Sequence, residues 1–138
     1  MAVAVDVGEW NDIHPLNKKA VGHRLALGAK KLVYDEETVF SGPMYLKHTI
    51  KEDKVNVVFE TFGSSLTTKG GTLRGFALAG EDGKFYWADA NIEGNTVLLR
   101  STQVKKPRYV SYAWADNPDT ANLYNMEGLP AVPFRTGK

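Results

Sequence analysis

The amino-acid sequence predicts a mainly β protein, in which an antiparallel β-sandwich of Ig-like size follows a short strand, loop and helix. Apolar and polar residues alternate with a period of two in the later part of the chain, as in half-buried strands. Turn-forming sequences separate these runs at intervals of roughly ten residues. Helical periodicity is confined to the beginning, so we place a domain boundary between residues 1–40 and 41–138.

The first forty residues predict a strand, a loop and a helix in that order. The strand is expected over residues 2–5 and the helix from Pro15 to about Val33, because apolar residues recur there at helical spacing: Leu16, Ala20, Val21, Leu25, Gly28, Ala29 and Leu32. Gly22 and Gly28 each weaken an isolated helix by about 1 kcal/mol, so we expect them to pack closely against another element. One strand and one helix cannot form a sheet alone, which predicts that residues 1–40 are the tail of a larger domain.

Residues 41–138 predict about six or seven short strands. The first is expected to bury an apolar face made by Met44, Leu46, His48 and Ile50, and a second to continue that face with Val55, Val57 and Phe59. Further strands are expected at residues 73–79, 85–92, 96–101 and 108–115, the first two of them as a hairpin. The proline-containing tail is expected to pack without pairing.

Composition narrows the classes of partner. The formal net charge of +1 gives no strong field to attract nucleic acid or an anionic membrane. No apolar run approaches the roughly 18 residues of a membrane span. The chain has no cysteine, which excludes disulfides and thiolate metal sites but does not separate the periplasm from the cytosol. We expect no metal, no cofactor, no nucleic acid and no membrane.

The chemistry expected of the chain is concentrated around His14. A helix N-terminus disfavours added positive charge, so an imidazole just before the helix tends to be neutral and able to act as a general base. Asp12 can approach it from two residues before, and Asn11 can orient the ring through its amide. The same pattern is also typical of a helix N-cap region, in which Asp12 or Asn11 accepts backbone N–H bonds and His14 is solvated.

Three runs in the sequence are similar to the C-terminal part of a sialate O-acetylesterase, a member of the SGNH-hydrolase group: "DVGEWNDIHPLNKKAVGHRLAL", "SGPMY" and "YAWADNPDTANLYNMEGLPAVPFRT". The resemblance implies that residues 1–40 are the end of an SGNH catalytic domain and that His14 is its catalytic base. The SGNH pattern has an acid three residues before that histidine. Here Asn11 holds that position and Asp12 lies one residue closer, so either is expected to orient His14.

The resemblance implies an esterase that releases acetate from O-acetylated sialic acid, with a periplasmic or secreted location. The nucleophilic serine has no counterpart in this sequence, because Ser64 and Ser65 lie in a glycine-rich loop without a G-x-S-x-G elbow. The serine is therefore expected in an upstream SGNH domain, and this chain alone is expected to be inactive, as enzymes that lose a triad member are.

Two other functions fit the same sequence. Five aromatic residues could make a platform for a sugar ring, although alternation is expected to bury about half of them: Tyr86, Trp87, Tyr109, Tyr112 and Trp114. Alternatively, residues 41–138 could be purely structural, with the apolar helix residues packed on the β module or on a second copy in a homodimer.

Overall fold

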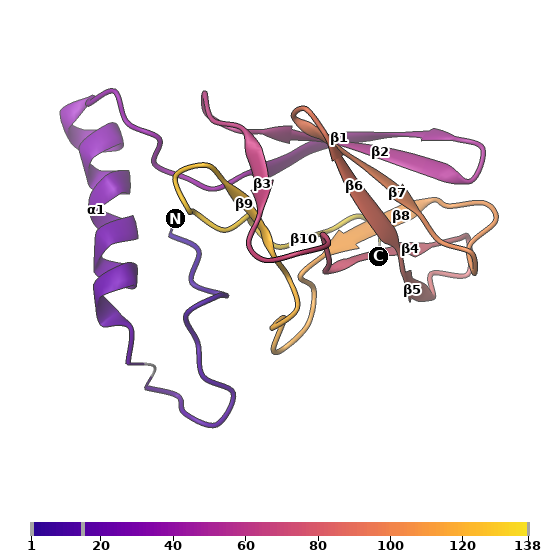
Figure 1. The fold of residues 1–138 in the computed structure, drawn as a ribbon, viewed down its shortest axis with the longest axis horizontal. Coiled ribbons are helices and arrows are strands. Elements are labelled where there is room, and N and C mark those ends of the chain that lie inside the picture. The colour runs from indigo at the N-terminus through magenta and orange to yellow at the C-terminus, as the bar shows by residue number, and fades with distance from the viewer. Residues whose placement is uncertain (1, 15, 138) are drawn as a thin grey trace.

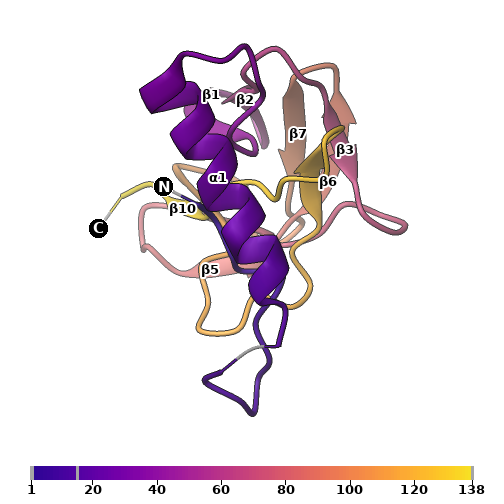
Figure 2. The same cartoon turned by 90° about the vertical axis from the view of Figure 1, so that its left-hand side faces the viewer.

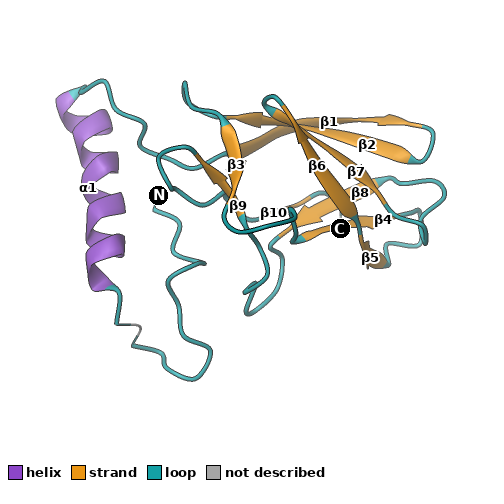
Figure 3. Ribbon diagram, in the orientation of Figure 1, coloured by secondary structure: helices purple, strands orange, loops and turns teal. Residues whose placement is uncertain are grey.

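The computed structural model describes residues 2–14 and 16–137. They form one α-helix followed by ten short strands, so the chain is mainly β and its sheets are antiparallel (Figures 1 and 3). The elements are α1 (Lys18–Tyr34), β1 (Met44–Lys51), β2 (Lys54–Glu60), β3 (Leu66–Thr68), β4 (Phe76–Ala79), β5 (Phe85–Trp87), β6 (Asp89–Glu93), β7 (Thr96–Arg100), β8 (Tyr109–Tyr112), β9 (Leu123–Asn125) and β10 (Phe134–Arg135).

The strands belong to two four-stranded sheets with the orders β1-β2-β7-β6 and β10-β8-β4-β5, and to a two-stranded sheet of β3 and β9. Both larger sheets contribute to one core, in which the rings of Phe59 and Phe76 meet edge to face with centroids 6.4 Å apart. The chain passes between these sheets at Ala88, the single residue between β5 and β6. The Ala88 amide donates to the Phe76 carbonyl over 3.1 Å.

The predicted hairpins form, but residues 85–92, expected as one strand, divide at Ala88 into β5 and β6, which belong to different sheets. The buried face of the first strand was also predicted wrongly. Val55, Val57 and Phe59 of β2 are buried as expected. In β1 the register with β2 shifts between Tyr45 and Lys47. Tyr45 thereby packs on the core, where its ring stacks on Phe134, whereas the apolar residues expected inside are exposed: Met44, Leu46 and Ile50. A bulge inverts the alternation of a strand, which a regular period of two does not predict.

The tail was also predicted wrongly, because it pairs. Strand β9 pairs with β3, and β10 pairs with β8. The loop between β9 and β10 lies over Gly42, where an added Cβ would come 1.9 Å from the carbonyl oxygen of Pro130. Only glycine fits under this backbone, so the "SGP" sequence forms a close contact in addition to a turn.

Helix α1 lies at one side of the β structure, beside the N-terminal segment (Figures 1 and 2). It begins later than predicted, at Lys18, because the Asn17 side chain caps it by accepting from the Ala20 amide. The predicted start at Pro15 lies outside the described residues. Residues 2–4, expected as strand, adopt no regular structure.

The helix buries only one side chain, that of Arg24. Leu25 and Leu32 are 58% and 72% exposed, so the apolar stripe of the helix does not rest on the β sheets. The prediction that Gly22 and Gly28 allow close packing is wrong for this chain, since nothing lies within 4 Å of a Cβ built on either residue.

A buried ion pair connects the N-terminal segment, the helix and the β structure. Arg24 donates from Nη1 and Nη2 to the two carboxylate oxygens of Asp6 over 2.6 and 2.8 Å, and from Nη1 also to the Val3 carbonyl over 2.7 Å. The Tyr124 hydroxyl, at the centre of β9, donates to Asp6 Oδ2 over 3.1 Å. The path of the N-terminal segment is therefore fixed from two sides.

Candidate functional site

The loop that carries His14 is held by its own side chains. Asp12 Oδ1 accepts the backbone N–H of His14 over 2.7 Å. The Asp12 amide donates to the Glu9 carbonyl over 3.3 Å, and Glu9 Oε1 accepts the Leu16 amide over 3.2 Å. The carboxylate of Asp12 thus fixes a local turn at His14, whereas the cap of the helix is Asn17 and not Asp12 or Asn11. Asp12 contacts the backbone of His14, whereas an orienting group would contact the ring.

All three residues predicted for the site, Asn11, Asp12 and His14, are exposed at the surface of this loop. The loop brings them together in sequence order, four residues before the helix begins at Lys18. Three large apolar side chains of the same segment are also uncovered: Trp10 is 85%, Ile13 90% and Leu16 81% exposed. His14 is therefore accessible to groups that approach from outside the chain.

The serines weighed in the sequence have another role. Ser64 lies in the turn between β2 and β3, where its hydroxyl donates to the Glu127 carboxylate and accepts the Met126 amide over 3.3 Å. These bonds tie two loops together, which agrees with the loop interpretation. Among residues 2–14 and 16–137, no group of three His, Cys, Asp or Glu side chains could hold a metal ion, and no helix is long and apolar enough to cross a membrane.

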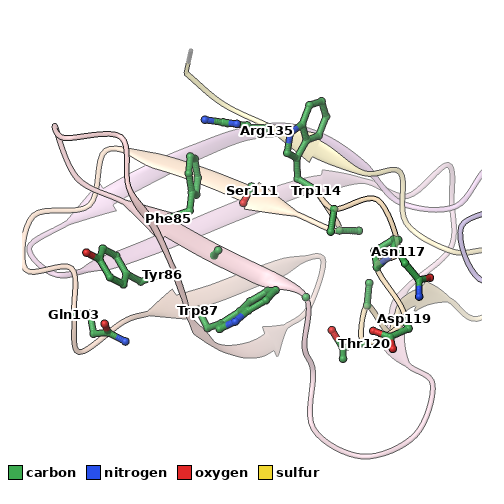
Figure 4. Close-up of a pocket in the computed structure, with 16 residues that line it drawn as sticks. Phe85, Tyr86, Trp87, Gln103, Ser111, Trp114, Asn117, Asp119, Thr120 and Arg135 are labelled. Carbon is green, nitrogen blue, oxygen red and sulfur yellow. The ribbon is translucent and has the colours of Figure 1, made fainter. Parts of the chain in front are cut away.

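A cavity of about 790 Å³ lies between the N-terminal loop and the loop that follows β8. Glu9 and Trp10 line it on one side and residues 113–118 on the other. The same loop after β8 also lines a second cavity of about 540 Å³, on the sheet that contains β4, β5 and β8 (Figure 4). Trp114 lines both cavities, so this one loop lies between the cavity beside Glu9 and Trp10 and the cavity on the sheet.

The five aromatic residues considered for sugar binding divide between core and surface. Tyr112 is buried, and its hydroxyl accepts the Leu123 amide over 2.9 Å. Tyr86 packs against the core and Tyr109 is half-buried. Trp87 and Trp114, in contrast, are 70% and 60% exposed and line the second cavity.

Comparison with solved structures identifies a protein that is similar to this chain. The chain superimposes with a TM-score of 0.96 and 44% sequence identity on the crystal structure of a novel carbohydrate acetylesterase from Xanthomonas citri. The match covers 99% of this chain and 32% of that one. The chain is similar to part of a carbohydrate acetylesterase. No protein-family model matches it, and no curated protein does.

The similarity to the Xanthomonas acetylesterase supports the relationship to carbohydrate esterases that the sequence motifs indicated. This chain spans about a third of the length of that acetylesterase, so two thirds of it have no counterpart here. The match includes the Asn11 to His14 loop, the uncovered helix α1 and the β sheets together, since it omits only 1% of this chain.

Proposed function

We propose that this chain is the C-terminal part of a carbohydrate esterase that hydrolyses O-acetyl esters of sialic acid and releases acetate. The observation that carries the esterase assignment is the 44% identity to a carbohydrate acetylesterase over 99% of the chain. The choice of sialic acid rests on the three sequence runs that resemble sialate O-acetylesterases. The enzyme is of the serine type in this proposal.

In the proposed reaction a serine hydroxyl from outside this chain attacks the acetyl carbonyl, and His14 takes its proton. The imidazolium returns the proton to the sugar oxygen as the ester bond breaks. Water then attacks the carbonyl of the acetyl-serine while His14 takes its proton, and His14 passes that proton to the serine oxygen as acetate leaves. Exposure of the His14 loop supports this role, because the ring must meet a serine that another part of the protein supplies.

The group that orients His14 is Asp12 or Asn11. One oxygen of the Asp12 carboxylate accepts the His14 backbone N–H, which places Asp12 next to His14. Asn11 occupies the position at which the SGNH pattern places its acid. The variants Asp12→Asn and Asn11→Ala distinguish the two residues. Substitution of the residue that orients His14 should lower kcat strongly and change KM little.

Residues 1–40 are, in this proposal, the end of an SGNH catalytic domain, and residues 41–138 an Ig-like sandwich joined to it. The exposed apolar residues of the loop and helix support a covering domain, since large exposed apolar patches are rare on soluble proteins and usually mark interaction sites. Those residues are Trp10, Ile13, Leu16, Leu25, Leu32 and Val33. The periplasmic or secreted location expected from the resemblance belongs to the same proposal.

The test is an acetyl-ester hydrolysis assay of this chain joined to its SGNH domain. His14→Ala should lower kcat by about a thousandfold or more. His23→Ala is the matched control, because His23 is an exposed histidine on helix α1. If the His14 variant keeps activity within tenfold of the parent protein, His14 is not part of the mechanism. If this chain alone hydrolyses an activated acetate rapidly, the proposal that the nucleophilic serine lies outside this chain is wrong.

A further inference from the structure

One row across the sheet β10-β8-β4-β5 has small residues on the two central strands and large ones on the two edge strands. The register aligns Trp87, Ala77, Ser111 and Arg135 in one row across the four strands. Their neighbours along β4 and β8 are Phe76, Leu78, Val110 and Tyr112, all of which point into the core. The row therefore faces outward, with Ala77 and Ser111 as a low floor between Trp87 and Arg135.

Loops complete the walls of this depression, which forms the cavity of about 540 Å³. Trp114 stands at one side, and Figure 4 shows Asn117, Asp119 and Thr120 gathered at one end of it. Phe85 extends the wall that Trp87 begins, and the Arg135 guanidinium lies over its ring, 4.7 Å from the centroid. The wall thus presents flat aromatic faces together with amide, hydroxyl and carboxylate groups.

Both indoles are exposed well beyond what a core role requires, at 70% for Trp87 and 60% for Trp114. Leaving two large aromatic side chains in water forgoes the stabilisation that their burial would give, so a ligand is expected to cover them. The depression holds one acidic and one basic side chain, Asp119 and Arg135, and so has no net charge to attract an ion. Its chemistry fits a flat, uncharged molecule that carries many hydroxyl groups.

We propose that this depression, the sheet cleft, binds neutral pyranose units of an oligosaccharide. The C–H faces of the sugar rings stack on Trp87 and Trp114, and their hydroxyl groups bond to Asn117, Asp119 and Thr120. The cleft shares five residues of the loop after β8 with the cavity beside Glu9 and Trp10, so a sugar chain in the cleft would lead toward the loop that carries His14: Ala113, Trp114, Ala115, Asn117 and Pro118. The choice of sugar as ligand rests on the proposed esterase function, whereas the existence of the cleft does not.

The experiment is a fluorescence titration of the 138-residue chain carrying Trp10→Phe. The chain has three tryptophans, and this substitution leaves Trp87 and Trp114 as the only ones. The probes are cellohexaose, xylohexaose and mannohexaose, with sialyllactose as an acidic comparison. At least one hexaose should change the emission with a Kd of about 1 mM or lower. Isothermal titration of the unchanged chain should give the same Kd.

Three variants locate the site. Trp87→Ala and Trp114→Ala should each raise Kd at least tenfold in isothermal titration. Ala77→Leu fills the floor of the cleft without replacing an aromatic residue and should do the same. Far-UV circular dichroism and the thermal midpoint show whether each variant is folded, and a variant that fails this check is replaced by Asp119→Ala.

Binding by none of the hexaoses up to about 10 mM, binding by sialyllactose alone, or binding that survives the cleft variants would each overturn the proposal. None of these measurements involves ester hydrolysis. A cleft that binds hexaoses in a protein whose His14→Ala variant remains active would therefore refute the proposed mechanism and keep the sugar site, and the reverse result would refute the site alone.

Discussion

The hydroxyl of Tyr124 donates to Oδ2 of Asp6 over 3.1 Å and so joins residues 118 positions apart in sequence. The same carboxylate receives both Nη groups of Arg24. The side chains of Arg24 and Asp6 are only 10% and 9% exposed, so the pair is well shielded from water. This cluster, Asp6, Arg24 and Tyr124, is the point at which the N-terminal segment, helix α1 and strand β9 meet.

Asp6→Ala should lower the free energy of unfolding by about 3–5 kcal/mol, because it leaves the Arg24 charge buried without a partner. Tyr124→Phe removes one hydrogen bond and should cost about 1 kcal/mol. Urea unfolding followed by circular dichroism measures both. Glu36→Ala breaks the half-exposed Lys30–Glu36 pair and is the control, expected within about 0.5 kcal/mol of the parent. If Asp6→Ala and Glu36→Ala lower the free energy of unfolding equally, the Asp6–Arg24 pair is not shielded from water as described.

The Asp6 carboxylate in this cluster should also make the stability of the protein depend on pH. Burial alone would raise the pKa of Asp6, but the hydrogen bonds and charge of Arg24 and the Tyr124 hydroxyl outweigh it and hold the pKa below its ordinary value of 3.8. A carboxyl with a lowered folded pKa contributes stability above its unfolded pKa and loses it as the pH falls through the folded one. Between about pH 5 and about pH 2, the free energy of unfolding should therefore fall more steeply with decreasing pH in the parent than in Asp6→Asn.

Two glycine substitutions should have opposite effects. Gly22→Ala places a methyl group in open space within helix α1 and should stabilise the isolated chain by about 1 kcal/mol. Gly42→Ala would drive its Cβ to 1.9 Å from the Pro130 carbonyl oxygen and should cost about 3 kcal/mol or more. Thermal unfolding compares them. If Gly22→Ala destabilises the protein once the SGNH domain is attached, that glycine lies against the added domain.

Tyr112→Phe tests a buried hydrogen bond in the core. The Tyr112 hydroxyl accepts the Leu123 amide over 2.9 Å, and burial raises the pKa of the tyrosine. Removing the hydroxyl leaves that amide without its acceptor, which should cost about 1–3 kcal/mol. Tyr109→Phe, at a half-buried position on the same strand, should be nearly neutral. Similar denaturation midpoints for the two variants would argue against the core bond.

The isolated chain should self-associate through helix α1. Leu25, Leu32 and Val33 leave an apolar surface uncovered, and such surfaces tend to pair. Sedimentation velocity should show a concentration-dependent dimer that the double substitution Leu25→Lys with Leu32→Lys abolishes. Joining the SGNH domain should abolish it too, because the proposed domain covers the same face. A monomer at every concentration would show that the helix face is stable in water.

The sequence was most informative where side-chain periods are regular. Val55, Val57 and Phe59 are buried as alternation predicted, and the Phe85–Trp87 strand pairs with Phe76–Ala79 as the intervening turn predicted. Prediction was wrong where the backbone departs from a regular period. The shift between Tyr45 and Lys47 inverts one strand, and the two-residue strand β10 is too short to produce any pattern.

The candidate site illustrates a different limit. Local motifs located Asn11, Asp12 and His14 in one loop, and this loop is a real, hydrogen-bonded turn. Sequence could not show which atoms of Asp12 and His14 meet, since that depends on backbone angles. It also could not place Asp6 beside Tyr124, or Trp87 level with Ala77 and Ser111, because those relations arise from strand register. Exposure separated Trp87 and Trp114 from the other aromatic residues.

The single residue between β5 and β6 has a mechanical consequence for the sheet cleft. Strands on either side of Ala88 belong to different sheets, and the Ala88 amide is anchored to Phe76. The backbone of Trp87 is consequently held by hydrogen bonds at a corner between two sheets. A molecule that binds there meets a side chain whose backbone is already ordered, so little backbone conformational entropy is lost on binding.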